Sequence, residues 1–338
     1  MGSDPLIAVY LVTYRRPHLL RRALRSVLEQ THRRLKVVVV NDDPEDASVE
    51  DVVAEANDQR VTLFRPLARR GAAANFNLAF NERQADFGSV LEDDNWWEPR
   101  FLQEMLTALA NTNAPLAVGN ELIWEEAENG EWINTGRTIW DRVGVNTHQF
   151  KIEQVCGGAV ICNSSMLFRF PEAGSLTTPD EIPVDVTEHF RERLLRQEPV
   201  LMREPLVNYA VTRTTARAVG GPTWGVFQCL LIGSVFAALP SHVARADLAA
   251  RLWAACDGAT SPRATTLALT GIVVPEARDL YSQAPPLSKL RVLAWAIRRP
   301  AQVGAFWACR KTHRSEFDFL TKAPLTQELA ASLQLGAA

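Results

Sequence analysis

The sequence predicts an α/β fold in its N-terminal half and a helical region after it. Two short apolar runs rich in β-branched residues, at 6–13 and 35–40, are typical of buried parallel strands. Between them, Pro17 is placed to open a helix whose apolar residues recur on one face. Strand and helix signals that alternate at this pitch predict right-handed crossovers and a parallel sheet.

The later elements follow in order along the chain. The spacing predicts a helix over 49–56, a strand over 61–64, a helix over 71–85 and a strand over 87–91. Mixed strands and loops are expected from about 116 to 215, with a hairpin turn at Asn129-Gly130, a helix over 185–195 and a strand over 206–211. After Gly220-Gly221-Pro222 the pattern is almost wholly helical, so we predict two domains, residues 1–218 and 219–338.

The composition is that of a globular protein with a large core, since 47% of the 338 residues are apolar and 22% are charged. A formal net charge of −3 gives no general attraction to nucleic acid. No signal peptide is visible, and the longest apolar run, residues 225–239, is too short and too interrupted to span a bilayer. Five scattered cysteines without metal-ligand spacing favour reduced thiols and a cytoplasmic location: Cys156, Cys162, Cys229, Cys256 and Cys309.

Polar clusters follow three of the predicted strands. They are Thr13-Tyr14-Arg15, Asn41-Asp42-Asp43 and Glu92-Asp93-Asp94-Asn95. Because ligands of open α/β sheets bind at the carboxyl ends of the strands, we expect these clusters to converge on one edge. Adjacent carboxylates repel each other unless a cation lies between them, and a hard divalent cation shared with a substrate's phosphates suits them. A solvated acidic turn that caps the helix near Pro99 is the simpler alternative for the third cluster alone.

Five segments, in their order and spacing, resemble family 2 glycosyltransferases over roughly residues 6–215. They are residues 12–17 (VTYRRP), 24–31 (LRSVLEQT), 38–43 (VVVNDD), 71–77 (GAAANFN) and 92–95 (EDDN). The resemblance implies a GT-A fold, which is Rossmann-like and has a mixed, mostly parallel sheet with flanking helices. It also implies a nucleoside-diphosphate sugar of the UDP or dTDP type, and transfer of a sugar such as a hexose to an acceptor hydroxyl with inversion at the anomeric carbon. The helical C-terminal third matches no family pattern.

The resemblance also implies roles for particular residues. Asp42 would accept the imide N–H of the base, Asp93 would approach the ribose or the metal, and Asp94 would coordinate a Mn²⁺ or Mg²⁺ ion that bridges the diphosphate. Other nucleotide contacts are expected at Thr13, Tyr14, Arg15 and Gly71, although the family often has Asn at position 15. Electrophilic help to the leaving diphosphate could also come from Arg70, unless Arg69-Arg70 is a solvated surface pair.

Inversion needs a base on the acceptor side, and Asp185 is our candidate. It lies six residues before Arg191 at a predicted helix start, which resembles the family's base motif, although Val184 replaces the usual Glu. A plain helix N-cap is the alternative for Asp185. Asp180, Glu181 and Glu188 are further candidates. The predicted sugar pocket is flanked by five tryptophans that could line it or belong to the core: Trp96, Trp97, Trp124, Trp132 and Trp140.

Two other functions stay open at this point. A nucleotidyltransferase would need a glycine-rich loop after the first strand, and residues 13–17 contain no glycine. A non-catalytic sugar-nucleotide-binding protein is the second alternative, although the carboxylates at 42, 93, 94 and 185 are intact. The acceptor could be a glycan, a lipid-linked saccharide or a small molecule.

The segment 289–315 contains seven basic residues and no acidic one, interleaved with Leu, Trp and Phe. Such a helix pair could lie peripherally on the anionic inner face of a membrane. The alternative is that the helix pair packs on the catalytic domain or on a second copy of the chain. Its apolar content, which is enough for a core, favours this packing over the membrane contact.

Overall fold

The computed structural model describes residues 4–82, 84–110, 112–143, 159, 161–170, 176–213 and 222–335. Contacts divide the described chain into two compact units. Of the described residues, the first unit holds those within 4–143, 159–191 and 197–213, and the second holds 192–196 and 222–335. The predicted domain boundary at 218/219 lies outside the described residues.

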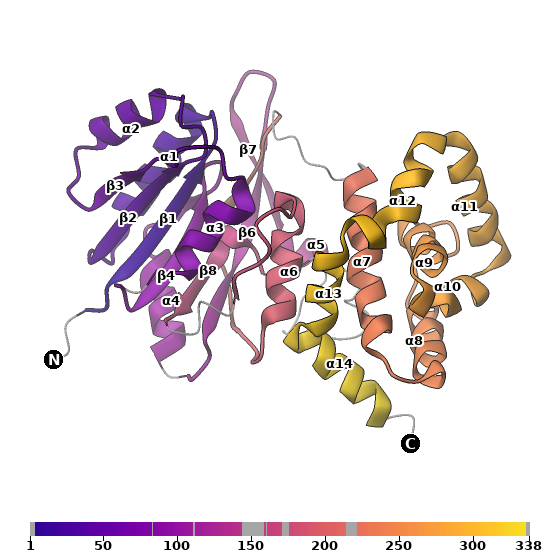
Figure 1. Cartoon of the computed structure of the whole chain (residues 1–338). Helices are drawn as coiled ribbons and strands as arrows, with labels where there is room; N and C mark the ends of the chain where they lie inside the picture. Colours follow the sequence, from indigo (N-terminus) through magenta and orange to yellow (C-terminus); the bar gives the residue numbers. More distant parts are fainter. Residues whose placement is uncertain are drawn as a thin grey trace. The chain divides into compact units, whose positions relative to one another are not determined.

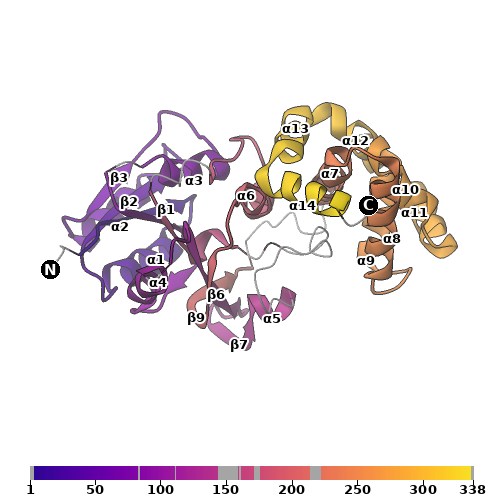
Figure 2. The same cartoon turned by 90° about the horizontal axis from the view of Figure 1, so that it is seen from below.

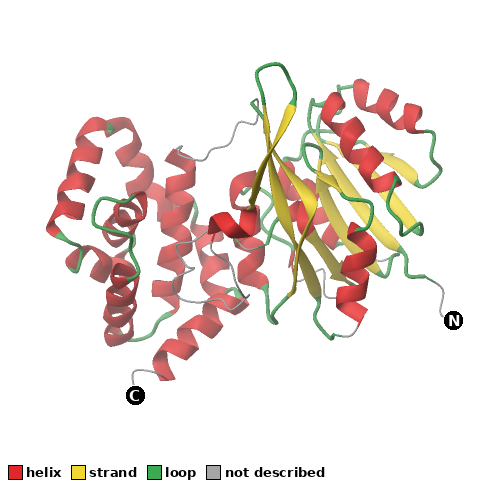
Figure 3. Ribbon diagram, turned by 180° about the vertical axis from the view of Figure 1, so that it is seen from behind, coloured by secondary structure: helices red, strands yellow, loops and turns green. Residues whose placement is uncertain are grey.

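The first unit is built on one nine-stranded mixed sheet (Figures 1 and 3). Its order is β3-β2-β1-β4-β8-β6-β9-β5, with β7 paired to β6. The first four strands in this order are parallel to one another, and β8 joins them to β6 through antiparallel pairings. The predicted α/β fold is confirmed. The strands are β1 (Ile7–Thr13), β2 (Leu35–Asn41), β3 (Val61–Phe64), β4 (Phe87–Glu92), β5 (Trp96–Trp97), β6 (Leu116–Glu126), β7 (Trp132–Thr138), β8 (Met166–Arg169) and β9 (Val200–Val211).

Helices cover both faces of the parallel half (Figure 2). The side chains of Ile7, Val9 and Leu11 alternate along β1 and pack in one core with α1 (Pro17–Leu28), α2 (Ser48–Ala56) and α4 (Phe101–Ala110). The opposite face of β1 carries α3 (Ala72–Phe80). The remaining helical segments of this region are α5 (Ile139–Val143), η2 (Asn163–Ser165), η4 (Val184–Val186) and α6 (Thr187–Leu194).

The strand register confirms that the polar clusters meet at one edge. Thr13 lies opposite Asn41, and Val12 lies opposite Glu92. All three parallel strands therefore end at the same level, with Asp42 and Asp93 one residue beyond their strand ends.

Several predicted bounds differ from the observed ones. The helix predicted over 71–85 ends at Phe80, and the strand predicted over 206–211 begins at Val200. The helix predicted from 185 opens with the 3₁₀ turn η4. The hairpin is confirmed, and Gly130 at its turn has a φ of +80°, which favours glycine.

The described part of the second unit is helical, as predicted. Its long helix α7 is apolar on every side, and α9, α12, α13 and α14 contact it. No helix among the described residues is long and apolar enough to cross a membrane. The helices are α7 (Pro222–Ala238), α8 (His242–Ala254), α9 (Pro262–Val273), α10 (Arg278–Ser282), α11 (Pro286–Arg298), α12 (Pro300–Thr312), α13 (Arg314–Lys322) and α14 (Pro324–Leu335), with the 3₁₀ turn η5 (Pro275–Ala277) before α10.

The four cysteines in the described part of the chain, Cys162, Cys229, Cys256 and Cys309, are free thiols. This agrees with the predicted reduced state. Cys156 lies outside the described residues.

Candidate functional site

The acidic pair at the end of β4 is bridged by an arginine. Nη2 of Arg16 donates to Oδ1 of Asp93, and Nη1 of Arg16 donates to Oδ2 of Asp94 at 2.9 Å. Arg16 directly precedes α1, so the β1–α1 turn places its guanidinium over the end of β4. Burial disfavours its charge, but the two carboxylates more than offset this and raise the pKa of Arg16. The cation that the acidic pair requires is, in this structure, the protein's own.

Asp93 is fully buried and hydrogen-bonded to β1 and to the turn after it. Its Oδ2 accepts from Oγ1 of Thr13 at 2.7 Å and from the backbone N–H of Tyr14 at 3.4 Å. Burial raises the pKa of Asp93 to about 6, with Asp94 adding to the shift and Arg16 opposing it. The structure thus brings together Thr13, Tyr14 and Asp93, as predicted for the nucleotide edge.

Asp94 is joined to a half-exposed aromatic cluster through Arg22 of α1. Nη2 of Arg22 donates to the carbonyl oxygen of Asp94 at 2.7 Å. The guanidinium lies 3.8 Å from the ring centre of Trp96 and 4.2 Å from that of Trp132. Trp124 packs on Trp96 with ring centres 5.4 Å apart. A patch of aromatic faces therefore adjoins the acidic pair.

Two of the five candidate tryptophans belong to the core instead. Trp97 and Trp140 are 2% and 5% exposed, and Nε1 of Trp97 donates to the carbonyl oxygen of Ser164. Only Trp96, Trp124 and Trp132 are left as candidates for sugar contact.

Asp42 fixes the turn that opens α3. Its Oδ1 accepts three hydrogen bonds, from the backbone N–H groups of Arg70 and Gly71 at 2.9 and 3.0 Å and from Nδ2 of Asn75 at 2.7 Å. Gly71 has a φ of +85°, a conformation that glycine adopts without strain. Nε of Arg69 donates to the other carboxylate oxygen, Oδ2, at 3.4 Å, so Oδ2 is the Asp42 oxygen that faces this arginine.

Arg15 and Arg69 enclose the ring of Tyr14, with guanidinium carbons 5.1 and 4.3 Å from its centre. Arg15 has a φ of +57° and donates through Nε to Asp43, and this hydrogen bond lowers the pKa of the Asp43 carboxyl. A non-glycine residue in the left-handed region costs about 1 kcal/mol and is concentrated at functional sites. The backbone of Arg70 and the side chain of Arg69 both contact Asp42.

The start of α6 is linked to the end of β4 by hydrogen bonds through η2. The backbone N–H of Asn163 donates to Oε1 of Glu188 at 2.9 Å, and Nδ2 of Asn163 donates to Oγ1 of Thr187 at 3.1 Å. The next residue, Ser164, donates through Oγ to Oε2 of Glu92 at 3.0 Å. This network ties the segment that carries Asp185 to the acidic motif.

Asp185 lies in η4 and is half-buried. The chain that leads to it is held by α3, since Nδ2 of Asn77 donates to the carbonyl oxygen of Thr178 and to Oδ1 of Asp180, both at 2.7 Å. Asp180 is thereby engaged in anchoring, and Glu188 is engaged with Asn163. Glu181 is exposed.

The residues at the end of β4 fit a divalent cation that is completed by a substrate. Asp93 and Asp94 present two hard carboxylate oxygens to one point, the point that Arg16 contacts. Within the described residues no group of three His, Cys, Asp or Glu side chains could hold a metal by itself. Mg²⁺ in phosphate-transfer sites is commonly held by one or two carboxylates plus substrate phosphates, so two are enough.

Three functional features escape prediction from the sequence. Arg16 carries no pattern apart from its place before Pro17, although the need of two adjacent carboxylates for a cation is a signal that could have found it. The contact of Arg22 with both Trp96 and Trp132 joins three elements that are distant in sequence. Asn163 gives no sequence signal at all.

Residues 8–170 match the model of glycosyl transferase family 2. These residues are a family 2 glycosyltransferase domain. The domain is 31% identical over 107 residues to the putative colanic acid biosynthesis glycosyl transferase WcaA of Escherichia coli K12. That match covers 31% of this chain and 38% of WcaA.

Two further relatives match at lower identity. Glycosyltransferase GlyA of Streptococcus pneumoniae is 23% identical over 174 residues, 50% of this chain and 25% of GlyA. The E. coli UDP-Glc:alpha-D-GlcNAc-diphosphoundecaprenol beta-1,3-glucosyltransferase WfgD is 24% identical over 142 residues, 42% of this chain and 56% of WfgD. The matches therefore span from a quarter to just over half of these relatives.

Among solved structures, residues 1–349 of S. aureus TarS in complex with UDP-GlcNAc superpose with a TM-score of 0.55 at 12% identity. The superposition covers 98% of this chain and 92% of that one. The GT-A fold with a helical C-terminal region is thereby confirmed.

The buried carboxyl of Asp93 predicts a pH-dependent stability in metal-free protein. Its folded-state pKa of about 6 lies above the ordinary 3.8, so the folded protein holds this proton more tightly than the unfolded chain does. That contribution is complete below about pH 4 and is lost as the pH rises to about 6. Asp93→Asn removes it, so the stability of the variant relative to the natural protein should rise by up to about 3 kcal/mol between pH 4 and pH 7. Urea unfolding in chelator across this range measures the difference, and a pH-independent difference would contradict the assignment.

Proposed function

We propose that the protein is an inverting glycosyltransferase that moves a sugar, of the hexose class, from a UDP- or dTDP-sugar to an acceptor hydroxyl. The observation that carries the proposal is the acidic pair Asp93-Asp94 at the carboxyl edge of a family 2 domain. Both carboxylates bind the same cation, the Arg16 guanidinium. The names of two similar proteins support a uridine donor, since TarS is described with UDP-GlcNAc and WfgD is named for UDP-Glc.

The donor's base and ribose would lie along Thr13–Arg15, Asp42, Gly71 and Asp93. Oδ2 of Asp42 is the acceptor for a base imide N–H, because Oδ1 already takes three hydrogen bonds. The ring of Tyr14 offers a flat face next to it, with Arg69 alongside to meet negative charge. Arg15, bound to Asp43, supports this turn.

A Mn²⁺ or Mg²⁺ ion on Asp94, with Asp93 assisting, would neutralise the charge that develops on the leaving diphosphate. Arg16 occupies the same carboxylate oxygens, so ion and guanidinium compete. Donor binding would release Arg16 from at least one carboxylate and free its charge for the phosphates.

Substitution at Asp94 tests the metal site. We expect Asp94→Ala to lose most turnover and Mn²⁺ binding in the presence of UDP, with the fold retained. Arg16→Gln removes the competing cation, so Mn²⁺ alone should bind roughly tenfold more tightly to that variant, a difference of about 1.4 kcal/mol. Calorimetric titration and UDP release measure the two effects, and full turnover in excess chelator would rule the metal out.

Asp185 is proposed as the general base. In the reaction the acceptor oxygen would bond to the anomeric carbon, and its hydroxyl proton would pass to Asp185. The bond from the anomeric carbon to the diphosphate would break, and its electron pair would leave with the diphosphate. The hydrogen bonds from Asn163 and Ser164 that link the start of α6 to β4 support a position at the donor edge. Asp180, one of the alternative carboxylates, serves as an anchor for Asn77.

Asp185→Asn keeps the size of the side chain and removes its basicity. Turnover should fall by roughly two to four orders of magnitude, the usual contribution of a positioned base. Donor affinity should stay unchanged, because the donor contacts lie elsewhere. UDP release and UDP-sugar titration separate the two effects. If Asp185→Asn turned over normally while substitution of Asp180 or Glu181 silenced the enzyme, the assignment to Asp185 would be wrong.

The acceptor would approach the aromatic patch of Trp96, Trp124 and Trp132, whose faces suit a sugar ring. The name of WfgD describes a lipid-linked acceptor for that protein. We propose the same acceptor class here, at a membrane surface that the chain reaches peripherally. A nucleotidyltransferase would instead release pyrophosphate, and a binding protein would release nothing, so the UDP-release assay separates these alternatives.

Helix α11 supports the peripheral contact. Leu287, Leu290, Leu293 and Ile297 recur along one side and are between 52% and 72% exposed. The opposite side of α11, with Ser288 and Val292, is buried. Packing inside the protein therefore involves that side and leaves the apolar stripe exposed. Arg298 is exposed at the C-terminal end of α11, and α11 carries no acidic residue. Apolar side chains flanked by cations suit an anionic lipid surface.

Co-sedimentation with vesicles tests this contact. The protein should bind phosphatidylglycerol-containing vesicles more tightly than phosphatidylcholine vesicles. Leu290→Ser with Ile297→Ser should weaken binding at least tenfold, since two exposed apolar side chains lose their burial. Leu67→Ser, at a fully exposed leucine of the first unit, is the matched control. Indifference to anionic lipid would refute the contact, and a dimer that the same double substitution dissolves would assign the stripe to a second copy.

A further inference from the structure

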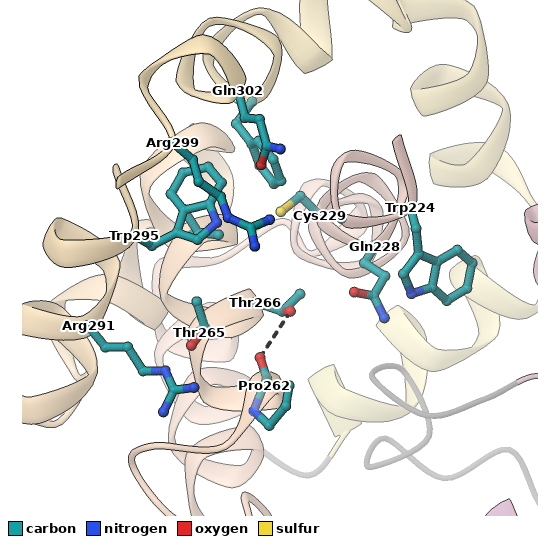
Figure 4. Close-up of a pocket in the computed structure, with 13 residues that line it drawn as sticks. Trp224, Gln228, Cys229, Pro262, Thr265, Thr266, Arg291, Trp295, Arg299 and Gln302 are labelled. Atoms are coloured by element: carbon teal, nitrogen blue, oxygen red, sulfur yellow. Dashed lines mark hydrogen bonds between the residues drawn. The ribbon is translucent and has the colours of Figure 1, made fainter. Parts of the chain in front are cut away.

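The second unit contains a cavity of about 280 Å³ between α7, α9, α11 and α12 (Figure 4). Thirteen described residues line it, and none of them is acidic, whereas two are arginines, Arg291 and Arg299. The cavity therefore carries two positive charges without an opposing carboxylate in its lining. Its volume is near the lower end of the range for small-ligand sites, about 300 Å³, which suits one sugar ring with a charged group.

The two arginines are held differently. Nη1 of Arg291 donates to the carbonyl oxygen of Thr260, just before α9, so its head is fixed at the rim. Arg299, at the junction of α11 and α12, points its guanidinium into the open centre (Figure 4). A guanidinium in this position can bind a phosphate or carboxylate in bidentate fashion.

Neutral polar groups surround the same space. The hydroxyls of Thr265 and Thr266 on α9 and the amides of Gln228 on α7 and Gln302 on α12 line it. Oγ1 of Thr266 donates to the carbonyl oxygen of Pro262 at 3.2 Å, and it keeps its lone pairs for a ligand. Hydroxyl and amide groups both donate and accept, so they match the hydroxyls of a saccharide.

An aromatic wall completes the cavity. Trp295 of α11 packs edge-on against Phe306 of α12, with ring centres 4.9 Å apart and an interplanar angle of 77°. Gly225 of α7 makes room for this wall, since a Cβ there would lie 2.8 Å from the ring of Phe306. An indole face beside hydroxyl and amide groups is suited to the apolar face of a sugar ring.

We propose that this cavity is a binding site for a small anionic saccharide, a sugar that carries a phosphate or a carboxylate. The anion binds Arg299 with help from Arg291, the ring packs on Trp295, and the threonines and glutamines take its hydroxyls. The site belongs to the helical unit and is separate from the proposed donor site. Its binding can be measured without any glycosyl transfer, so failure of the proposed enzyme activity leaves this proposal testable.

Titration of the full-length protein with four probes tests the site. Glucose 6-phosphate and glucuronate should bind saturably with a Kd of about 1 mM or tighter, and glucose and inorganic phosphate at least tenfold more weakly. Arg299→Gln should weaken glucose 6-phosphate about tenfold, because a charge-assisted hydrogen bond is lost. Arg298→Gln changes a neighbouring exposed arginine outside the lining and should leave the affinity unchanged.

A second readout locates the ligand. In protein labelled with 5-fluorotryptophan, the ¹⁹F resonance that Trp295→Phe removes should shift on addition of glucose 6-phosphate. UDP serves as the probe of the donor site, and its affinity should be the same in Arg299→Gln. No saturable binding, equal losses in Arg298→Gln and Arg299→Gln, or a stationary Trp295 resonance would each overturn the proposal. Inorganic phosphate binding as tightly as glucose 6-phosphate would overturn its saccharide part.

Discussion

The polar edge of the sheet depends on one constraint: two adjacent carboxylates are buried at the end of β4, and their charges repel each other. Asp93 is fully buried and Asp94 is 8% exposed, so neither is screened by bulk water. Their repulsion must be met by a cation, and the structure supplies Arg16 from the turn after β1. This explains why the parallel strands, and not only the acidic motif, define the site. The register that places Val12 opposite Glu92 also brings Arg16 over the pair.

The turn at Tyr14–Arg16 connects all three polar strand ends. The backbone of Tyr14 donates to Asp93, Arg15 binds Asp43, and Arg16 bridges Asp93 and Asp94. Arg15 takes a left-handed conformation, which lets consecutive side chains reach different strands. The proposed exchange of the Arg16 guanidinium for a metal ion and phosphates would therefore need only the Arg16 side chain to move, within a turn that stays anchored by Tyr14 and Arg15.

The sequence was sufficient for the fold and for the convergence of the site, because both rest on local patterns. Buried apolar runs and helix starts set the alternation, and the carboxyl ends of parallel strands meet by geometry. The sequence was not sufficient to predict which groups each side chain contacts. Asp42 was predicted to bind the base, yet one of its oxygens holds the α3 turn through Asn75 and two backbone N–H groups. Such contacts join residues about 30 positions apart, and no periodicity encodes them.

The same limit explains the C-terminal helices. The mixture of basic and apolar residues in 289–315 fits both a packed helix and a surface helix, since composition alone does not assign faces. Position around α11 assigns them. Val292 points to the core and Trp295 to the cavity, whereas Leu290 and Ile297 are exposed. The basic residues of α11 also lie on different sides, since Arg291 lines the cavity and Arg298 lies outside that lining. One short helix thus presents a cavity-lining face and an exposed apolar face, and because these lie on different sides, either can be altered without removing the other.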